Sequence, residues 1–228
     1  MTRGELDAVK NYYDSIANEY DQSRFANSYG QYIHEQERTV LAKHADKIDR
    51  QNCLDLACGT GRFLDLASAG ADISEEMLRI ARAKHPDKEL IQASATQLSF
   101  QDRSFSSVIS FHLLMHLEKT EIALVLKEVH RVTKPGGFFI FDIPSSSRRK
   151  LLRHKREGWH GSTAMNKNEV QSMCADQWEI QAVEGICLLP IHRINSRSRQ
   201  KWIEFDTFLS ATFLKSWCSY NIYVLKKL

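Results

Sequence analysis

The chain has 228 residues, of which 43% are hydrophobic and 26% are charged, and its formal net charge is +3. This composition is ordinary for a globular protein, and so small a charge does not by itself imply a polyanionic partner. No apolar run reaches the ~18–20 residues that cross a bilayer. The first residues lack a secretory signal, and the five cysteines form no CxxC pair. We therefore expect a soluble cytoplasmic protein with free thiols.

The first two thirds of the chain alternate between helix-like and strand-like patterns. Residues 5–45 predict helices, because apolar side chains recur every three or four positions over 14–20 and 29–45. The next predicted elements are a strand at 53–58, a helix at 74–85, strands at 89–93 and 107–111, a helix at 120–131, a turn at 134–137 and a strand at 138–143. Strands that alternate with helices predict a parallel sheet covered on both faces.

The last third is more polar. Residues 145–161 are strongly basic, and they precede a predicted helix at 166–175, a strand at 178–189, a helix at 200–214 and a closing strand at 220–225. This part carries too little apolar material for a core of its own. We therefore expect one domain, residues 1–228, in which the tail continues the sheet.

A glycine turn follows the strand predicted at residues 53–58. Gly59 and Gly61 allow a sharp turn and a close approach of the backbone to a ligand. Asp72 is placed to end the next strand, where a carboxylate can accept hydrogen bonds from two ribose hydroxyls. The third glycine of the dinucleotide fingerprint is replaced by Leu64, and no GKS or GKT follows, so a dinucleotide site and a Walker loop are both disfavoured.

Residues 54–63 (LDLACGTGRF) resemble the first motif of the class I S-adenosylmethionine-dependent methyltransferases. Four more motifs follow in the order of that family: residues 72–78 (DISEEML), 98–105 (LSFQDRSF), 116–117 (HL) and 131–137 (RVTKPGG). Upstream, Tyr13-Asp14-Ser15-Ile16-Ala17 with Tyr20-Asp21 resembles the opening of the ubiquinone/menaquinone-biosynthesis type, the methyltransferase type 11 group. The resemblance implies an α/β, Rossmann-like doubly wound fold. It has a mostly parallel seven-stranded sheet with an antiparallel last strand. It also implies a helical N-terminal lid over 1–50, a cofactor-binding core over 51–143, and substrate-side insertions within 144–228.

The same resemblance implies roles for individual residues toward S-adenosylmethionine and its product S-adenosylhomocysteine. Asp72 would hold the ribose hydroxyls, and Phe111 would close over the cofactor. The other implied contacts are Asp55, Gly59 and Gly61 with the methionine moiety, Ile73 and Met77 with the faces of the adenine, Ser94 and Ala95 with its edge, Tyr20 from the lid, and Ala57 elsewhere on the cofactor.

Two departures from the family pattern lie within this site. Gly61 and Asp72 are only 11 positions apart, closer than the family usually places them. This spacing predicts a first helix of no more than about two turns over 62–67 and a short strand of small residues over 69–72. Ser94 stands where the family usually has an aspartate, so its hydrogen bond would lack charge assistance.

Two histidines, His112 and His116, follow the fourth predicted strand. An imidazole can take the proton that a hydroxyl or ammonium acceptor must lose, so both are candidate general bases, and a packed structural role is the alternative. Their HxxxH spacing suggests no third metal ligand, and we expect no metal site.

The basic and aromatic residues of the last third of the chain have several possible functions. A basic group at Arg148, Arg149, Lys150, Arg153, Lys155 and Arg156, and a second at Arg193, Arg197, Arg199 and Lys201, suit a solvated helix face, an acidic small molecule or anionic lipid headgroup, or RNA. The aromatic residues Trp202, Phe205, Phe208, Phe213 and Trp217 could line an apolar acceptor pocket or be ordinary core. The expected function is O-, N- or C-methylation of a small molecule. The alternatives are methylation of RNA such as tRNA, and a non-catalytic cofactor-binding or partner subunit.

Overall fold

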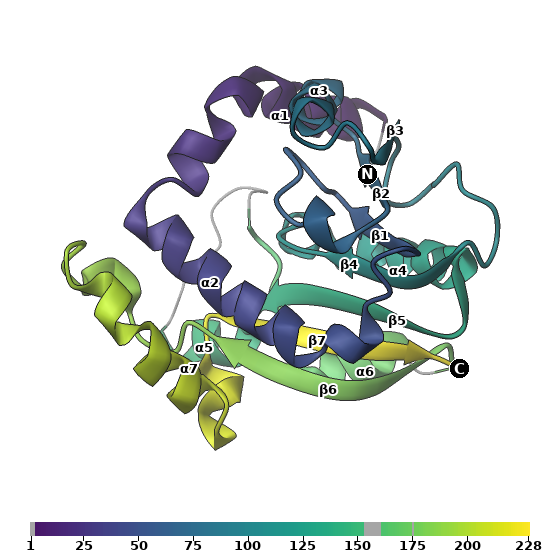
Figure 1. Cartoon of the computed structure of the whole chain (residues 1–228). Coiled ribbons are helices and arrows are strands. Elements are labelled where there is room, and N and C mark those ends of the chain that lie inside the picture. The colour runs from purple at the N-terminus through teal and green to yellow at the C-terminus, as the bar shows by residue number, and fades with distance from the viewer. Residues whose placement is uncertain (1–2, 153–160, 175) are drawn as a thin grey trace.

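The computed structural model describes residues 3–152, 161–174 and 176–228 (Figure 1). Its centre is a seven-stranded sheet in the order β3-β2-β1-β4-β5-β7-β6. The strands are β1 (Cys53–Leu56), β2 (Ala69–Asp72), β3 (Glu89–Gln92), β4 (Phe105–Ser110), β5 (Thr133–Pro144), β6 (Trp178–Ile186) and β7 (Tyr220–Lys227). Strand β7 runs antiparallel to both of its neighbours, whereas the pairs from β3 to β5 are parallel. The expected seven-stranded fold with an antiparallel last strand is confirmed.

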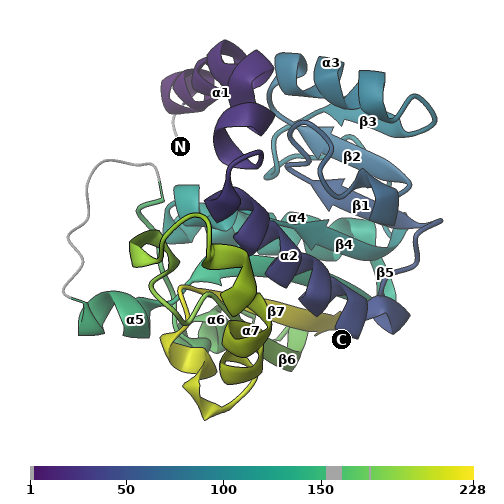
Figure 2. The ribbon, with the colours of Figure 1, turned by 60° about the vertical axis from the view of Figure 1, so that its left-hand side comes forward.

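Helices cover both faces of this sheet (Figures 1 and 2). They are α1 (Arg3–Arg24), α2 (Ser28–Lys43), α3 (Glu75–Lys84), α4 (Lys119–Val132), α5 (Ser146–Leu151), α6 (Lys167–Cys174) and α7 (Ile203–Ser210). Side chains alternate across each strand, so neighbouring residues of β5 enter different cores. Ile140 joins the core that includes α2 residues such as Leu41, and Phe139 joins the core that includes α4 residues such as Val125.

The link from β1 to β2 is as short as the sequence predicts. Residues 57–68 contain one 3-10 turn, Leu64–Leu66, in place of a crossover helix. Strand β2 spans Ala69–Asp72 and is buried throughout. A Cβ on Gly70 would lie 2.8 Å from Leu90 Cδ2 and 2.9 Å from Cys58 Sγ. The small residues of β2 therefore let the shortened link pack closely, and this prediction is confirmed.

The helices predicted over 5–45 are confirmed as α1 and α2, which are separate because Asn27 caps α2 by accepting hydrogen bonds from the N–H groups of Tyr29 and Gly30. Two other predictions were wrong. The predicted turn at 134–137 lies inside β5, where the register shifts against β4. A Cβ on Gly137 would lie 2.6 Å from Ser106 O, so this glycine lets the two strands approach.

The second correction concerns residues 200–214, where one helix was predicted. The structure has a 3-10 turn at Arg199–Trp202, then α7, then a second 3-10 turn at Phe213–Trp217. Thr212 separates the last two pieces, because its side chain accepts a hydrogen bond from Leu214 N. Among the described residues, no helix is both long enough and apolar enough to span a membrane.

Candidate functional site

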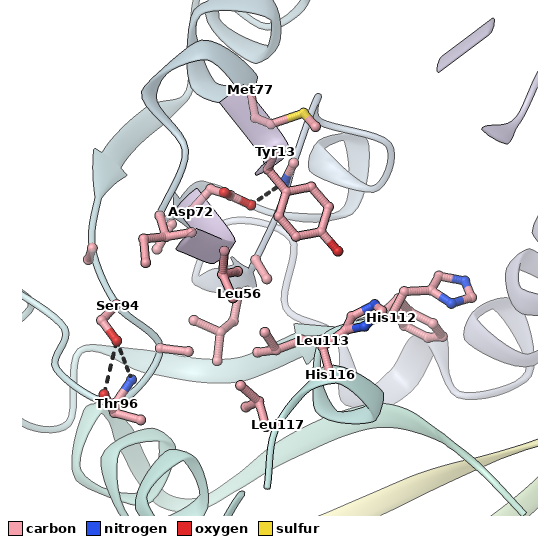
Figure 3. A pocket seen from close by; sticks show the side chains of 18 of the residues that line it. Tyr13, Leu56, Asp72, Met77, Ser94, Thr96, His112, Leu113, His116 and Leu117 are labelled. Atoms are coloured by element: carbon pink, nitrogen blue, oxygen red, sulfur yellow. Dashed lines mark hydrogen bonds between the residues drawn. The ribbon is translucent and has the colours of Figure 1, made fainter. Parts of the chain in front are cut away.

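A cavity of about 300 Å³ lies at the carboxyl ends of β1, β2 and β4. From β1 the chain proceeds to β2 and β3 on one side of the sheet and then returns to β4 and β5 on the other side, so the strand order reverses between β1 and β4. Ligands of open α/β sheets bind at such a switch point. The predicted site residues on its wall are Tyr20, Ala57, Gly59, Asp72, Ile73, Met77, Ser94, Ala95, Phe111, His112 and His116. Figure 3 shows Asp72 and Met77 on one side, Ser94 and Thr96 at one end, and the two histidines toward the other. Asp55 and Gly61 do not line the cavity.

Asp72 joins two parts of the cavity wall. Its Oδ2 accepts a hydrogen bond from Gly59 N at 2.8 Å (Figure 3), and its Oδ1 accepts one from Ser74 N at 2.9 Å. The carboxylate thus connects the glycine turn to the N-cap of α3. Burial raises the pKa of Asp72 above its ordinary value. A carboxylate has about four lone-pair sites, so two remain for ligand hydroxyl groups.

The glycine turn has a left-handed backbone at three positions. Gly59 has φ +53°, and a Cβ there would meet nothing within 4 Å, so its open side belongs to the cavity. Gly61 has φ +88°, and a Cβ there would lie 2.9 Å from His85 Cδ2, so its role is in packing. Ala57 has φ +58°, a conformation that costs a non-glycine residue roughly 1–2 kcal/mol. Such strain is typical of ligand-binding turns.

Asp55 lies within β1, behind the cavity wall, with 3% of its surface exposed. Burial raises its pKa to about 8, although Arg62 acts in the opposite direction. In the unfolded chain the same group has its ordinary pKa of 3.8. Between pH 3.8 and about pH 8, the Asp55 carboxyl is therefore protonated in the folded protein and ionised in the unfolded chain.

We expect Asp55→Asn to remove this pH dependence. The contribution of Asp55 to the stability of the wild type is fully present below the unfolded pKa. This contribution is lost as the pH rises toward 8, by up to about 1.4 kcal/mol per pH unit. The variant should therefore gain stability relative to the wild type between pH 5 and pH 8, as measured by urea unfolding. Unfolding free energies that run parallel over this range would contradict the assignment.

The opposite end of the cavity is shaped by Ser94 and its neighbours. The Ser94 hydroxyl lies 2.9 Å from Thr96 Oγ1 and accepts a hydrogen bond from Thr96 N at 3.3 Å. These bonds form a local turn after β3. Ile73, Met77 and Ala95 contribute apolar walls beside it.

Helix α1 closes the cavity from above and is held there by two aspartates. Asp14 accepts a hydrogen bond from the Ser74 hydroxyl at 2.5 Å, at the start of α3. Asp21 accepts one from the Thr60 hydroxyl at 2.6 Å, in the glycine turn, and pairs with Lys84. Sequence reasoning noted these residues in the repeated Tyr-Asp pattern but gave them no role. Each tyrosine of the pattern lines the cavity while the aspartate after it attaches the helix.

His112 lies where β4 ends, in a cluster of charged groups that the sequence analysis missed. Its backbone has φ +61°. Its Nε2 is 2.6 Å from Glu37 Oε1, and its Nδ1 is 3.6 Å from Asp142 Oδ2. Glu37 also pairs with Arg62. A carboxylate inside the apolar run of β5, Asp142, was the one signal in the sequence that could have revealed the cluster.

The pKa values in this cluster follow from burial and pairing. Burial opposes the charge of Glu37, but Arg62 and His112 lower its pKa to about 2. Burial also opposes the charge of His112, but Asp142 and Glu37 raise its pKa above 6.5. Glu37, His112 and Asp142 place one ligand atom each within 4.8 Å of one another, a spacing that suits a metal ion. Arg62 supplies positive charge to Glu37, whereas the buried Asp142 Oδ2 has no hydrogen-bond partner among the described residues.

His116 is held differently. Its Nδ1 accepts a hydrogen bond from Gly161 N at 2.8 Å, so a neutral ring carries its proton on Nε2. Its ring meets Tyr13 edge-on, with 6.4 Å between ring centroids.

A second cavity of about 210 Å³ adjoins the first. Both cavities are lined by Tyr13, Tyr20, His112 and His116. The second extends away from Asp72 toward α2 and β7, where Tyr29, Ile33 and Tyr220 form its walls. The two histidines therefore lie where the two adjoining cavities meet.

The predicted acceptor pocket of aromatic residues was wrong. Trp202, Phe205, Phe208, Phe213 and Trp217 line neither cavity, and all five are exposed. They cannot be core, because the inward face of α7 consists of Ile203, Asp206 and Ser210.

The basic segments are only partly within the described residues. Arg153, Lys155 and Arg156 lie outside them. Arg148 donates hydrogen bonds to the backbone carbonyls of Leu188 and Trp217, and Arg149 donates to those of Gly161 and Ser162. These two arginines therefore stabilise the fold, which weakens the case for an RNA-binding surface in this segment.

Comparison with known proteins adds sequence and structural relatives. Residues 54–141 match the family described as a methyltransferase domain. A demethylmenaquinone methyltransferase of Streptomyces avermitilis is 38% identical over 147 residues, which cover 60% of this chain and 62% of that enzyme. The chain thus spans less than two thirds of the length of curated relatives such as this one.

Solved structures share the fold over nearly the whole chain. A SAM-dependent methyltransferase of Thermotoga maritima, described as a possible histamine N-methyltransferase, has a TM-score of 0.69 and 16% identity, covering 95% of this chain and 98% of that one. The magnesium protoporphyrin IX methyltransferase of Synechocystis, solved with bound SAM, has a TM-score of 0.67 and 13% identity, covering 98% and 97%. These likenesses establish the fold.

Proposed function

We propose that this chain, a class I S-adenosylmethionine-dependent methyltransferase of the ubiquinone/menaquinone-biosynthesis-like group, methylates a small molecule in the cytoplasm. One observation supports this most strongly: a cavity at the switch point, with Asp72 on its wall, shares the two histidines with a second, adjoining cavity. The five cysteines are all free and buried, as suits a reducing compartment.

The residues of the first cavity fit the cofactor. Asp72 offers free lone pairs to ribose hydroxyls, Gly59 leaves room for a close approach, and Ile73 and Met77 offer apolar contact to an adenine. When bound, S-adenosylmethionine supplies an activated methyl group on a sulfonium. Ala57, Ser94, Ala95, Phe111 and Tyr20 complete the wall. Asp55 and Gly61 lie behind this wall, Asp55 buried within β1 and Gly61 packed against His85.

The second cavity suits a small acceptor with an apolar part. Its apolar walls include Phe25, Ile33 and Met115, and the two histidines lie at the end that it shares with the first cavity. Positioning an acceptor against an activated donor can supply several kcal/mol of the rate enhancement, up to roughly 7–11 in favourable cases. The chain's main contribution is therefore to hold the acceptor at this junction.

His112 is the group that removes the acceptor's proton, oriented by Glu37. Glu37 holds Nε2 at 2.6 Å, and Asp142 lies farther from Nδ1, at 3.6 Å, so an acceptor hydroxyl or amine would replace the Asp142 contact when Nδ1 takes its proton. Because the pKa of His112 is raised above 6.5, the basic form accumulates only at higher pH. Turnover should rise with pH through a midpoint above 6.5.

His112→Ala is expected to lower turnover by about 10²–10⁴-fold and to abolish this pH-dependent rise. The affinity for S-adenosylhomocysteine should change much less. His116→Ala should cost less turnover, since its Nδ1 is already engaged by Gly161 N. Unchanged turnover in both variants would remove the histidines from the mechanism.

Transfer of a tritiated methyl group identifies the acceptor class. The chain should label small acidic or quinone-like molecules, and the labelled product should elute with the small-molecule fraction. Labelling of tRNA alone would support the RNA alternative. Cofactor binding without transfer to any of these acceptors would support a non-catalytic subunit.

A further inference from the structure

An aromatic surface covers the outside of residues 202–217. It consists of Trp202, Phe205, Phe208, Phe213 and Trp217, with exposed fractions of 43%, 50%, 69%, 81% and 43%. These residues lie on the two 3-10 turns and on α7, at the lower left of Figure 1. Large exposed apolar patches on a folded protein mark a site of interaction.

The outward direction of these rings is fixed by firm anchoring of α7. Asp206, which is fully buried, accepts hydrogen bonds from the Tyr32 hydroxyl at 3.0 Å and from Leu189 N at 2.9 Å. Gln36 donates to the same carboxylate at 3.2 Å. These bonds hold one face of α7 against α2, so the aromatic residues on the other face remain in solvent.

Positive charge surrounds the aromatic surface. Residues 191–217 contain five arginine or lysine residues and two acidic residues, one of which is the buried Asp206. Arg193, Arg197 and Lys201 are exposed, and none forms an ion pair with another residue in the part of the chain that the structure describes. Glu204 is the one exposed acid of this segment.

We propose that the aromatic surface docks the protein on an anionic phospholipid bilayer. Phenylalanine and tryptophan side chains insert at the boundary between headgroups and acyl chains, while arginine and lysine remain beside the phosphates. The exposed rings match the acyl-chain boundary, and the exposed cations, which have no acidic partner within the described ranges, match the phosphate layer. The docking is peripheral and requires no spanning helix.

Two other occupants fit less well. A second copy of the chain would bring two net-positive segments face to face, which is unfavourable. RNA would use aromatic rings as stacking platforms. The adjoining helix α5 ends in Leu151 and Leu152, which are 68% and 62% exposed. Aliphatic side chains give no stacking platform for a base, but they do partition into a bilayer.

The aromatic surface adjoins the second cavity. Arg199, in the 3-10 turn that ends at Trp202, donates a hydrogen bond to Ser28 Oγ at 2.9 Å. Its guanidinium lies 5.9 Å from the ring centroid of Tyr29, which lines that cavity. Docking therefore places the acceptor-side walls near the lipid surface.

Cosedimentation with vesicles tests the docking without any acceptor, so it is independent of the proposed activity. The wild type should bind vesicles of equal parts phosphatidylcholine and phosphatidylglycerol, bind phosphatidylcholine alone weakly, and lose affinity as salt rises. Phe208→Ser with Phe213→Ser should weaken binding by about tenfold or more. Arg197→Glu with Lys201→Glu should weaken it by a similar factor.

Matched controls come from elsewhere on the surface. Leu228→Ser removes an apolar side chain, 65% exposed, beyond the far end of β7. Lys127→Glu reverses an exposed charge on α4, across the sheet. Both should bind vesicles like the wild type. Brominated lipids should also quench tryptophan fluorescence in the wild type, and less so in the double phenylalanine variant.

Three results would overturn the proposal. The first is a wild type that does not bind the mixed vesicles, or that binds them equally after both double substitutions. The second is a dimer that the phenylalanine substitutions dissociate, without vesicle binding, which would assign the surface to a second copy. The third is retention of RNA, in place of vesicles, through the same residues.

Discussion

Replacing Arg62 with methionine is expected to lower the free energy of unfolding by about 3–5 kcal/mol, because it leaves the carboxylate of Glu37 buried without its main partner. Glu37 has no exposed side-chain surface, and Arg62 and His112 together keep it ionised. The Arg62 guanidinium also lies 4.3 Å and 4.2 Å from the ring centroids of Phe25 and Phe63. Methionine retains part of the packing against these rings. The decrease in the free energy of unfolding therefore measures mainly the loss of the positive charge beside Glu37.

A double variant separates charge from packing. Adding Glu37→Gln to Arg62→Met removes the buried charge itself, so it should recover much of the lost stability. Urea unfolding of the wild type, both single variants and the double variant gives the coupling energy directly. A single Arg62→Met variant within about 1 kcal/mol of the wild type would mean that the cluster is not a stabilising ion-pair network.

Asp72→Ala is expected to weaken the binding of S-adenosylhomocysteine by about 100-fold or more. Two hydroxyl groups lose a charged acceptor, at roughly 1.5–3 kcal/mol each. The glycine turn also loses the hydrogen bond between Gly59 N and the carboxylate, so the site becomes less well ordered. Equilibrium dialysis of the folded variant, checked by circular dichroism, measures the effect.

Asp65→Ala is the matched control for Asp72→Ala. Asp65 lies in the same short link between β1 and β2, but it pairs with Arg38 at the surface and does not line the cavity. Its removal should leave the affinity within about twofold of the wild type, as expected for an exposed ion pair. Equal losses in the two variants would place the ligand somewhere other than Asp72.

Local sequence patterns were sufficient to predict most of the named residues that line the cavity at Asp72. The position of Asp72 follows from a strand that ends there, and the shortness of the link follows from the count of residues after Gly61. Both features depend on contiguous residues, so the chain itself encodes them. The same holds for α3, where Ser74 caps the helix by accepting a hydrogen bond from Met77 N.

The charged cluster around His112 could not be predicted in this way, because it is assembled from distant segments. Glu37, Arg62, His112 and Asp142 come from α2, the glycine turn and the ends of two strands. No spacing rule connects them. The outward aromatic residues were misassigned for a related reason. The 200–214 region has apolar side chains on a broad helical face, and the partners of Asp206 on α2 and near β6 decide which side is buried.

The most direct test of the account is a calorimetric titration of the wild-type chain with S-adenosylmethionine. The structure predicts saturable binding at one site per chain, competition by S-adenosylhomocysteine, and no competition by NAD, because Leu64 replaces the third glycine of a dinucleotide turn. Absence of binding, or displacement by NAD with equal affinity, would contradict the assignment of the cavity at Asp72.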